Sequence, residues 1–467
     1  MFLLSIAAPA LLSAAALIAT ADAPPANDGR ITTPAALSAM VARMPQFVPS
    51  FSRQTKLSCA MCHNGFPQLT AFGRMFKLNG YTLSGLPTIT DQRDSTHTSL
   101  ALSPVAPLSV MALISNTSLA KAMDGTQRST TQFPQQVSLF AASEISPKAG
   151  IFAQFTYEDQ RGTFGVDNID IRAASHVTVH EKDVLYGVTL HNNPTVQDVW
   201  NTTPAWGFPF TSSAVAPAPS ASTLVDGALA QSVVGLGAYA LYDGLVYAEV
   251  TGYTSAPQGA KLPADSSATS TTHGVAPYWR VALQRNFGAT YLMVGTFGLS
   301  ARLFPTGITG PTNSYRDVGV DAQLERKVGT GTLIGRASLI REAQTGRASV
   351  VANEAEHGTN TLRSLKVNAT YVASPLTTLS AGVFGVTGSP DALMYAAGDV
   401  TGSATGKPDS QGTIVEWTHA PWLNTRIGAQ YVMYSKFNGR ATSYDVTAGG
   451  RNANQNNTLY LYLWLAY

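Results

Sequence analysis

The chain has 467 residues, only 12% of them charged, and a formal net charge of +2. Soluble domains average about 25% charged residues, so this composition argues against an ordinary soluble protein. The near-neutral balance also argues against binding to nucleic acid or to a strongly charged partner.

Residues 2–21 form an apolar run that ends among the small residues Ala19, Ala21 and Ala23. This A-x-A spacing is typical of a signal-peptidase site, so we predict a signal peptide over residues 1–23, cleaved after Ala21 or Ala23. No Lys or Arg precedes the run, which leaves a retained anchor as the alternative. No later stretch is apolar for the ~20 residues that a membrane helix needs.

The only two cysteines, Cys59 and Cys62, stand directly before His63. Thiols at i and i+3 followed by an imidazole match the attachment motif of c-type haem, in which both thiols bond the porphyrin and the histidine coordinates the iron. The alternatives are a local disulfide or half of a zinc site. Zinc needs more ligands nearby, and the chain has no other cysteine.

Short helices are predicted on both sides of this motif. Two prolines bound a helix over residues 33–45. After the motif, Leu69, Phe72 and Phe76 share one helical face before Asn79 and Gly80 end the helix. We therefore predict a small helical monohaem cytochrome c domain with its linker over residues 24–104.

The second helix carries three candidate haem contacts. Met75 is the first candidate for the distal iron ligand, with packing as its alternative, and Met40, Met44, His97 and Met111 remain open. Arg74 and Lys77 are candidate partners of the haem propionates or of lumen carboxylates. A solvated helix face is the alternative for both cations.

From about residue 105 the apolar period changes from helical to two. In DVGVDAQLE, Val318, Val320, Ala322 and Leu324 alternate with Asp317, Asp321, Gln323 and Glu325, as in an apolar-out, polar-in barrel. Sixteen such runs alternate with seven short turns and eight longer polar loops. The sequence thus predicts an all-β fold over residues 105–467: a 16-stranded antiparallel transmembrane β-barrel with both termini on the periplasmic side, and the helical domain folded into or against its lumen.

Three further features belong to this barrel. Its last strand has aromatic residues opposite four leucines, and we expect these to join an interfacial girdle: Tyr460, Tyr462 and Trp464, with Trp279, Trp417 and Trp422. The longest loop, roughly 191–229, carries several aromatic residues, and we predict that it folds over the mouth; packing on neighbouring loops is the alternative. Acidic and basic residues both occupy inward positions, so we do not favour guidance of a divalent cation over an ordinary lumen of mixed charge. The inward acidic residues are Asp170, Glu249, Asp317, Asp321, Glu325 and Glu416. The inward basic residues are Arg172, Arg280, Arg336 and Lys366.

Residues 45–85, with Cys59-Ala60-Met61-Cys62-His63 between PSFSRQT and FPQLTAFGRMFKLNGYTL, resemble the fused monohaem cytochrome-porin family of the outer membrane. NNPTVQDVWNTTPAWGFPF at 192–210 supports the resemblance. The family is best known from bacteria that oxidise dissolved ferrous iron outside the cell. The resemblance implies one covalent haem c in a domain that plugs a sixteen-stranded barrel and passes electrons from extracellular Fe(II) to a periplasmic carrier.

The resemblance does not fix iron as the donor, since relatives occur in organisms not known to use it. Iron:cytochrome oxidoreductase activity is therefore an expectation that is less secure than electron transfer. The competing functions are a passive porin whose cysteines form a disulfide, a monohaem porin serving another donor or acceptor, and a haem peroxidase or gas sensor with an open distal site.

Overall fold

The computed structural model describes residues 50–91, 100–158, 163–260, 262–422, 424–446 and 449–467. The predicted signal peptide over 1–23, the predicted helix over 33–45, and the ligand candidates Met40, Met44 and His97 lie outside the described residues.

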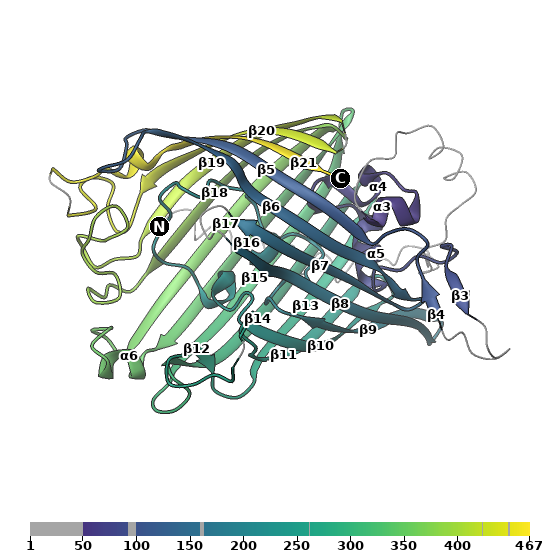
Figure 1. The fold of residues 1–467 in the computed structure, drawn as a ribbon, viewed down its shortest axis with the longest axis horizontal. Coiled ribbons are helices and arrows are strands. Elements are labelled where there is room, and N and C mark those ends of the chain that lie inside the picture. Colours follow the sequence, from purple (N-terminus) through teal and green to yellow (C-terminus); the bar gives the residue numbers. More distant parts are fainter. Residues whose placement is uncertain (1–49, 92–99, 159–162, 261, 423, 447–448) are drawn as a thin grey trace.

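Sixteen strand positions close into one antiparallel barrel (Figure 1). Strand β21 pairs with β5, which joins the two ends of the sheet. Short β12 lies in line with β13 along the same edge of β14 and shares one wall position with it. The bounds are β5 Leu108–Leu119, β6 Ser129–Ser146, β7 Ala149–Glu158, β8 Thr163–Val179, β9 Lys182–His191, β10 Val233–Tyr242, β11 Val246–Ser255, β12 Thr269–Thr272, β13 Ala276–Phe287, β14 Thr290–Thr306, β15 Asn313–Val328, β16 Gly331–Thr345, β17 Thr359–Ser374, β18 Thr377–Gly388, β19 Ser410–Trp422, β20 Thr425–Lys436 and β21 Thr458–Ala466. Each of the sixteen predicted runs is a strand of this wall, so the predicted barrel is confirmed.

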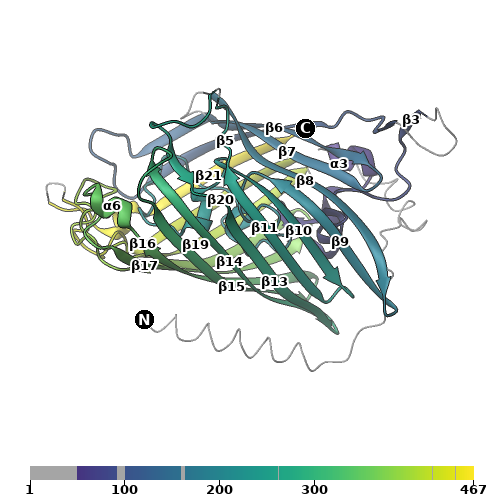
Figure 2. The same ribbon diagram turned by 90° about the horizontal axis from the view of Figure 1, so that it is seen from below.

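The connections alternate in length as predicted. Seven hairpins close with two or three residues at one end of the barrel, and the longer loops lie at the other end (Figures 1 and 2). The C-terminus lies at the short-turn end beside helix α3 (Ser50–Thr55), where the Arg53 guanidinium sits 5.9 Å from the ring centroid of Tyr467.

The remaining elements are short. The barrel is preceded by α4 (Cys59–Cys62), β1 (His63–Gly65), β2 (Gln68–Leu69), α5 (Ala71–Leu78), β3 (Ile89–Asp91) and β4 (Leu100–Leu102), and its loops carry η1 (Pro204–Trp206), η2 (Leu224–Ala228), α6 (Arg347–Val351) and η3 (Ala453–Asn456). Leu69 thus lies just before the predicted second helix rather than in it. None of the helices in the described part of the chain is long and apolar enough to cross a membrane.

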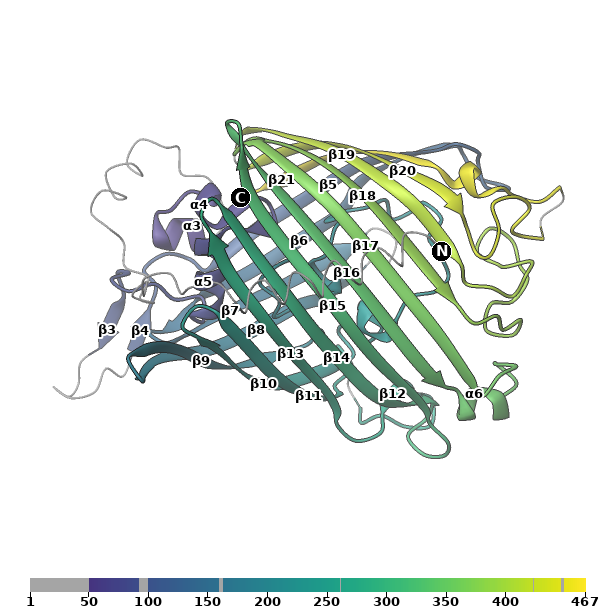
Figure 3. The same cartoon turned by 180° about the vertical axis from the view of Figure 1, so that it is seen from behind.

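The outer face of the barrel wall is apolar, as contact with lipid requires, and the inner face is polar, as contact with the filled bore requires. On β19, Val415 and Trp417 are 39% and 42% exposed on the outside, whereas Glu416 between them is 3% exposed and faces inward. Closure pairs every strand on both sides, which a membrane-spanning sheet needs because lipid offers no hydrogen bonds. The tilted wall is continuous from behind as well (Figure 3).

One part of the predicted girdle is wrong. Tyr460 and Tyr462 are 0% and 4% exposed and point into the bore, because the outward positions of β21 belong to Leu459, Leu461 and Leu465. Trp279, Trp417 and Trp422 are exposed on the outer face as predicted.

A charge on the outer face tests the position of the lipid. We expect Val383→Lys, halfway along β18, to lower the free energy of unfolding in lipid vesicles by about 2–4 kcal/mol, and Val328→Lys, at the turn end of β15, by about 0–1 kcal/mol. Urea titration of both variants measures this difference. Equal losses at the two positions would contradict the assigned membrane span.

Candidate functional site

The site is built by residues 50–83, here called the bore segment, which cross the barrel at its short-turn end. Its main chain and side chains contact the wall on opposite sides. Tyr81 Oη donates to Asp170 on β8 at 2.6 Å, Gln68 Oε1 accepts from Arg336 Nη1 on β16 at 3.0 Å, and Arg426 on β20 donates to the carbonyl of Phe66. The segment also reaches β5 and β6, since Gln54 donates to the carbonyl of Ala142 at 2.9 Å. These contacts hold the segment that carries the Cys59–His63 motif at the short-turn end of the bore.

The motif itself is one helical turn. Residues Cys59–Cys62 form α4, which puts the two thiols on the same side of the turn. The next helix, α5, is locked against this turn by its N-cap: Thr70 N donates to the carbonyl of Cys62 at 2.9 Å, and Thr70 Oγ1 donates to that of Met61 at 2.5 Å while accepting from Gly73 N.

Gly73 allows this close approach. A Cβ at position 73 would lie 2.2 Å from the carbonyl oxygen of Cys62, so no larger residue fits without moving α5 away. At the other end of α5, Gly80 has a φ of +73° and ends the helix as predicted.

Burial controls the ionisation of the motif residues. Burial lowers the pKa of His63 to about 4, so its imidazole is neutral at pH 7, and its Nδ1 is buried without a hydrogen-bond partner. A neutral imidazole with a free ring nitrogen is competent to ligate iron. Burial raises the pKa of Cys62 to about 12, with Cys59 adding to the rise.

Arg74 and Lys77 are both buried, which excludes the alternative of a solvated helix face. Arg74 pairs with Glu325 on β15, and its guanidinium lies 4.4 Å from the ring centroid of Tyr291. Lys77 Nζ donates to the carbonyls of Val196 and Asp198 at 2.6 and 2.9 Å. Burial, together with nearby Arg172, lowers the pKa of Lys77 to about 7. The lumen-carboxylate contact is thus realised by Arg74, while the predicted propionate contacts stay predictions.

The two methionine candidates within the described residues pack against protein. Met75 lies against the apolar cluster that includes Leu78, Trp200 and Tyr239. Met111 on β5 is 7% exposed. Their predicted ligation stays a prediction.

The long loop enters the bore, and it also contacts another loop, where Ser220 N donates to Asn438 Oδ1 at 3.1 Å. Residues 192–232, here called the lumen loop, touch the bore segment where Asn201 Oδ1 accepts from Leu69 N at 3.2 Å and where Lys77 meets the two loop carbonyls. Trp200, 1% exposed, donates from Nε1 to Tyr291 Oη at 2.7 Å. The loop that we predicted to fold over the mouth of the barrel therefore lies deeper, within the bore. Sequence reasoning missed Gln68 and Tyr81, whose partners Arg336 and Asp170 are more than 80 residues away and leave no local signal.

The predicted inward charges do face the bore, and most are already engaged. Asp170 pairs with Arg172 at 2.9 Å, and Asp321 with Arg280 at 2.6 Å. Asp317 accepts from the backbone of the lumen loop at Val225. This balanced pairing agrees with the expectation that the lumen is an ordinary mixed one rather than a path of free carboxylates for a cation.

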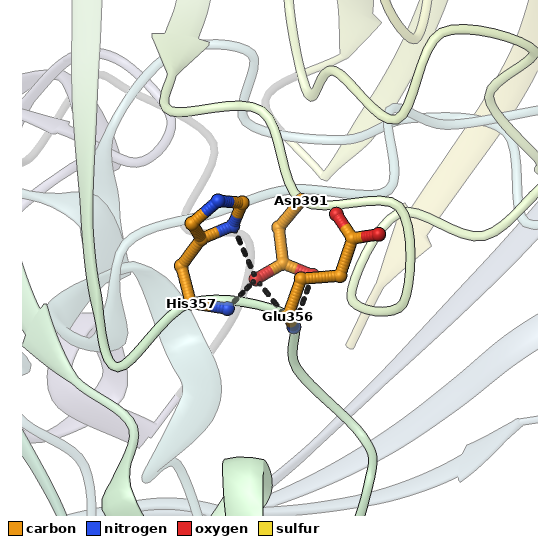
Figure 4. Close-up of side chains that lie close together, drawn as sticks. All are labelled: Glu356, His357 and Asp391. Atoms are coloured by element: carbon orange, nitrogen blue, oxygen red, sulfur yellow. Dashed lines mark hydrogen bonds and ion pairs between the residues drawn. The ribbon is translucent and has the colours of Figure 1, made fainter.

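A second candidate cluster lies in the loops at the far end of the barrel. Among the described residues, one group of three offers metal-type ligand atoms within 4.8 Å of one another: Glu356, His357 and Asp391 (Figure 4). The Asp391 carboxylate, however, accepts N–H bonds from Glu356, His357, Leu393 and Met394, and a further bond from Asn360 Nδ2. Its lone pairs are therefore used to join two loops, which favours a structural role over metal binding.

Together these features define the class: a porin-like, closed sixteen-stranded β-barrel whose bore is crossed by a CxxCH segment. No protein-family model matches the chain. No curated protein matches it either.

Several solved porins are distantly similar in structure. OmpT of Vibrio cholerae is 11% identical over 77% of this chain and 96% of its own, with a TM-score of 0.40. OmpF of Salmonella typhi is 11% identical over 77% and 97%, with a TM-score of 0.42. An anion-selective porin from Comamonas acidovorans is 10% identical over 77% and 98%, with a TM-score of 0.41. Similarities at these TM-scores carry no argument about the fold. The evidence for the barrel is the strand pairing of this chain itself.

Gly73→Ala tests the contact between α5 and the cysteine turn. We expect the added Cβ to lower the local free energy of opening of residues 58–80 by about 1–3 kcal/mol through overpacking. Amide hydrogen exchange measures the change. Ala71→Ser, at an exposed position of the same helix, is the matched control and should leave exchange unchanged; faster exchange in both variants alike would refute the contact.

Asp391 gives a pH prediction. Burial alone would raise its pKa, but the backbone N–H donors from Met394, Glu356 and His357 lower it from 3.8 to about 2. A folded-state pKa below the unfolded one stabilises the loops fully above about pH 4, and this stabilisation is lost as the pH falls through about 2.

Limited pepsin digestion between pH 2 and 4 follows this loss. Asp391→Asn should be cleaved in residues 346–358 or 389–409 across the whole range, while the exposed control Asp399→Asn should match the unmodified protein. Resistance of Asp391→Asn equal to that of the control would disprove the role of the carboxylate.

Proposed function

We propose that this chain is an outer-membrane electron-transfer protein. It takes electrons from extracellular Fe(II) onto one haem c bound covalently to Cys59 and Cys62, and it passes them to a periplasmic carrier. The apolar outer band and the alternation of short turns with longer loops support an outer-membrane location, with the short-turn end and the C-terminus in the periplasm.

The observation that carries the proposal is the position of the CxxCH turn. It lies at the short-turn end of the bore, in a segment whose hydrogen bonds reach β5, β6, β8, β16 and β20. The hydrocarbon layer is about 25–30 Å thick, so a group that serves donors and acceptors on opposite sides must sit within the barrel. A periplasmic carrier can then reach the motif from the turn end.

The residues have separate roles. Cys59 and Cys62 would form the thioether bonds, and His63 would coordinate the iron through its neutral imidazole. When bound, the haem supplies reversible one-electron chemistry. The chain fixes the motif through the Thr70 cap and the Arg74–Glu325 pair, and the lumen loop shields it from the long-loop side through its contacts to Leu69 and Lys77.

The filled bore weighs against a passive porin. The bore segment and the lumen loop contact inward side chains of most strands, in place of the open aqueous channel that a sixteen-stranded porin leaves. A monohaem barrel with another extracellular donor would use the same residues, so iron is the less secure part of the proposal.

Covalent haem is tested first. Protein matured in cells that attach c-type haem should give a pyridine haemochrome signal of one haem per chain, and Cys59→Ala/Cys62→Ala should abolish it. His63→Ala should retain covalent haem but lose the low-spin spectrum, because the proximal ligand is gone. Correctly folded protein without covalent haem would reject the proposal.

Stopped-flow mixing of the ferric protein with Fe(II) then tests the donor. We expect haem reduction with a rate that rises with Fe(II) concentration. If dithionite reduces the haem and Fe(II) does not, electron transfer stands and iron is rejected as the donor.

A further inference from the structure

A cavity of about 340 Å³ remains in the bore between the lumen loop and the wall formed by β17 to β21. Its wall residues, among them Ser364, Val386, Tyr434 and Thr458, lie in the halves of their strands nearer the long-loop end. The cysteine turn is at the opposite end of the bore. The cavity is thus separate from the proposed haem site, and its size falls in the range of small-molecule sites, about 300–1,000 Å³.

One charged hydrogen-bond donor enters this cavity from an inward position of β17. Lys366 Nζ uses one N–H on Asp226 of the lumen loop at 2.8 Å, and an ammonium has two more. These remaining N–H groups can donate to an anionic acceptor in the cavity.

The rest of the lining is largely apolar and aromatic. Phe384 and Tyr434 meet edge to face, with ring centroids 5.6 Å apart, and Phe208 of the lumen loop lines the same space. Pro217 and Pro219 complete the loop side, and neither can donate a backbone hydrogen bond. Such walls suit a flat apolar body better than a hydrated ion.

We propose that this cavity binds a small carboxylate with an aromatic body, of the benzoate class. Its carboxylate accepts a hydrogen bond from Lys366, and its ring packs against Phe384 and Phe208. A ferrous ion is the less suitable occupant, because the carboxylate of Asp226 is already paired with Lys366. Ligand binding in this cavity does not depend on haem chemistry, so its test is independent of the proposed electron transfer.

The test is isothermal titration of benzoate into the purified full chain with its haem in detergent, beside the neutral analogue benzyl alcohol. Benzoate should bind saturably and more tightly than benzyl alcohol. Lys366→Met should weaken benzoate binding by about tenfold or more, because a charge-assisted hydrogen bond is lost. Asp226→Asn should strengthen it by about threefold or more, because Lys366 is released from its partner.

These opposite signs separate ligand binding from a purely structural ion pair, whose loss would affect both variants alike. Lys436→Met is the matched control: its partner Asp409 lies at 3.6 Å, outside the cavity, and benzoate affinity should not change. If Lys366→Met does not fold, Lys366→Gln keeps a polar side chain of similar length without the charge and should also weaken binding. Absence of saturable benzoate binding, or equal affinities in the Lys366 and Asp226 variants, overturns the proposal.

Discussion

The structure depends on one constraint: two segments with only short helices and strands of their own fill a bore that is lined with charges. Their backbone groups need partners away from bulk water, and the wall side chains need partners too. The backbone groups of these segments and the side chains of the wall supply hydrogen-bond partners to each other. Arg172 donates to the carbonyl of Gln197 at 2.7 Å, Arg336 to that of Trp200 at 3.0 Å, and Asp317 accepts from Val225 N at 2.7 Å. The charged side chains of the wall thus hold the loop backbone in place, as a neighbouring strand does in a β-sheet.

This constraint explains why the charged side chains of the lumen do not form a path for ions. A carboxylate such as Asp321, bonded to Thr202 of the lumen loop and to Arg280, serves the packing of the loop. It also explains how a single turn carrying Cys59 and Cys62 stays fixed in so large a barrel. The turn has little apolar core of its own, and the wall supplies the surfaces against which it packs.

The same filling divides the bore into two regions with different chemistry. At the short-turn end, His63 is neutral and buried beside Phe66, which stacks on Trp464 with ring centroids 4.7 Å apart. Nearer the long loops, Lys366 and aromatic side chains line a cavity. The first region is the proposed haem site and the second is the proposed carboxylate site.

The sequence by itself determined the barrel and the motif, because both are local signals: a period of two sets which side chains face lipid, and Cys59, Cys62 and His63 are adjacent in the chain. It could not determine where the loops go. Tyr460 and Tyr462 were assigned to the wrong face because aromatic residues suit both a membrane interface and a packed bore, and only the occupied bore decides between them. The depth of the lumen loop and the burial of Arg74 and Lys77 rest on partners more than 100 residues away, which only the closed tertiary structure brings together.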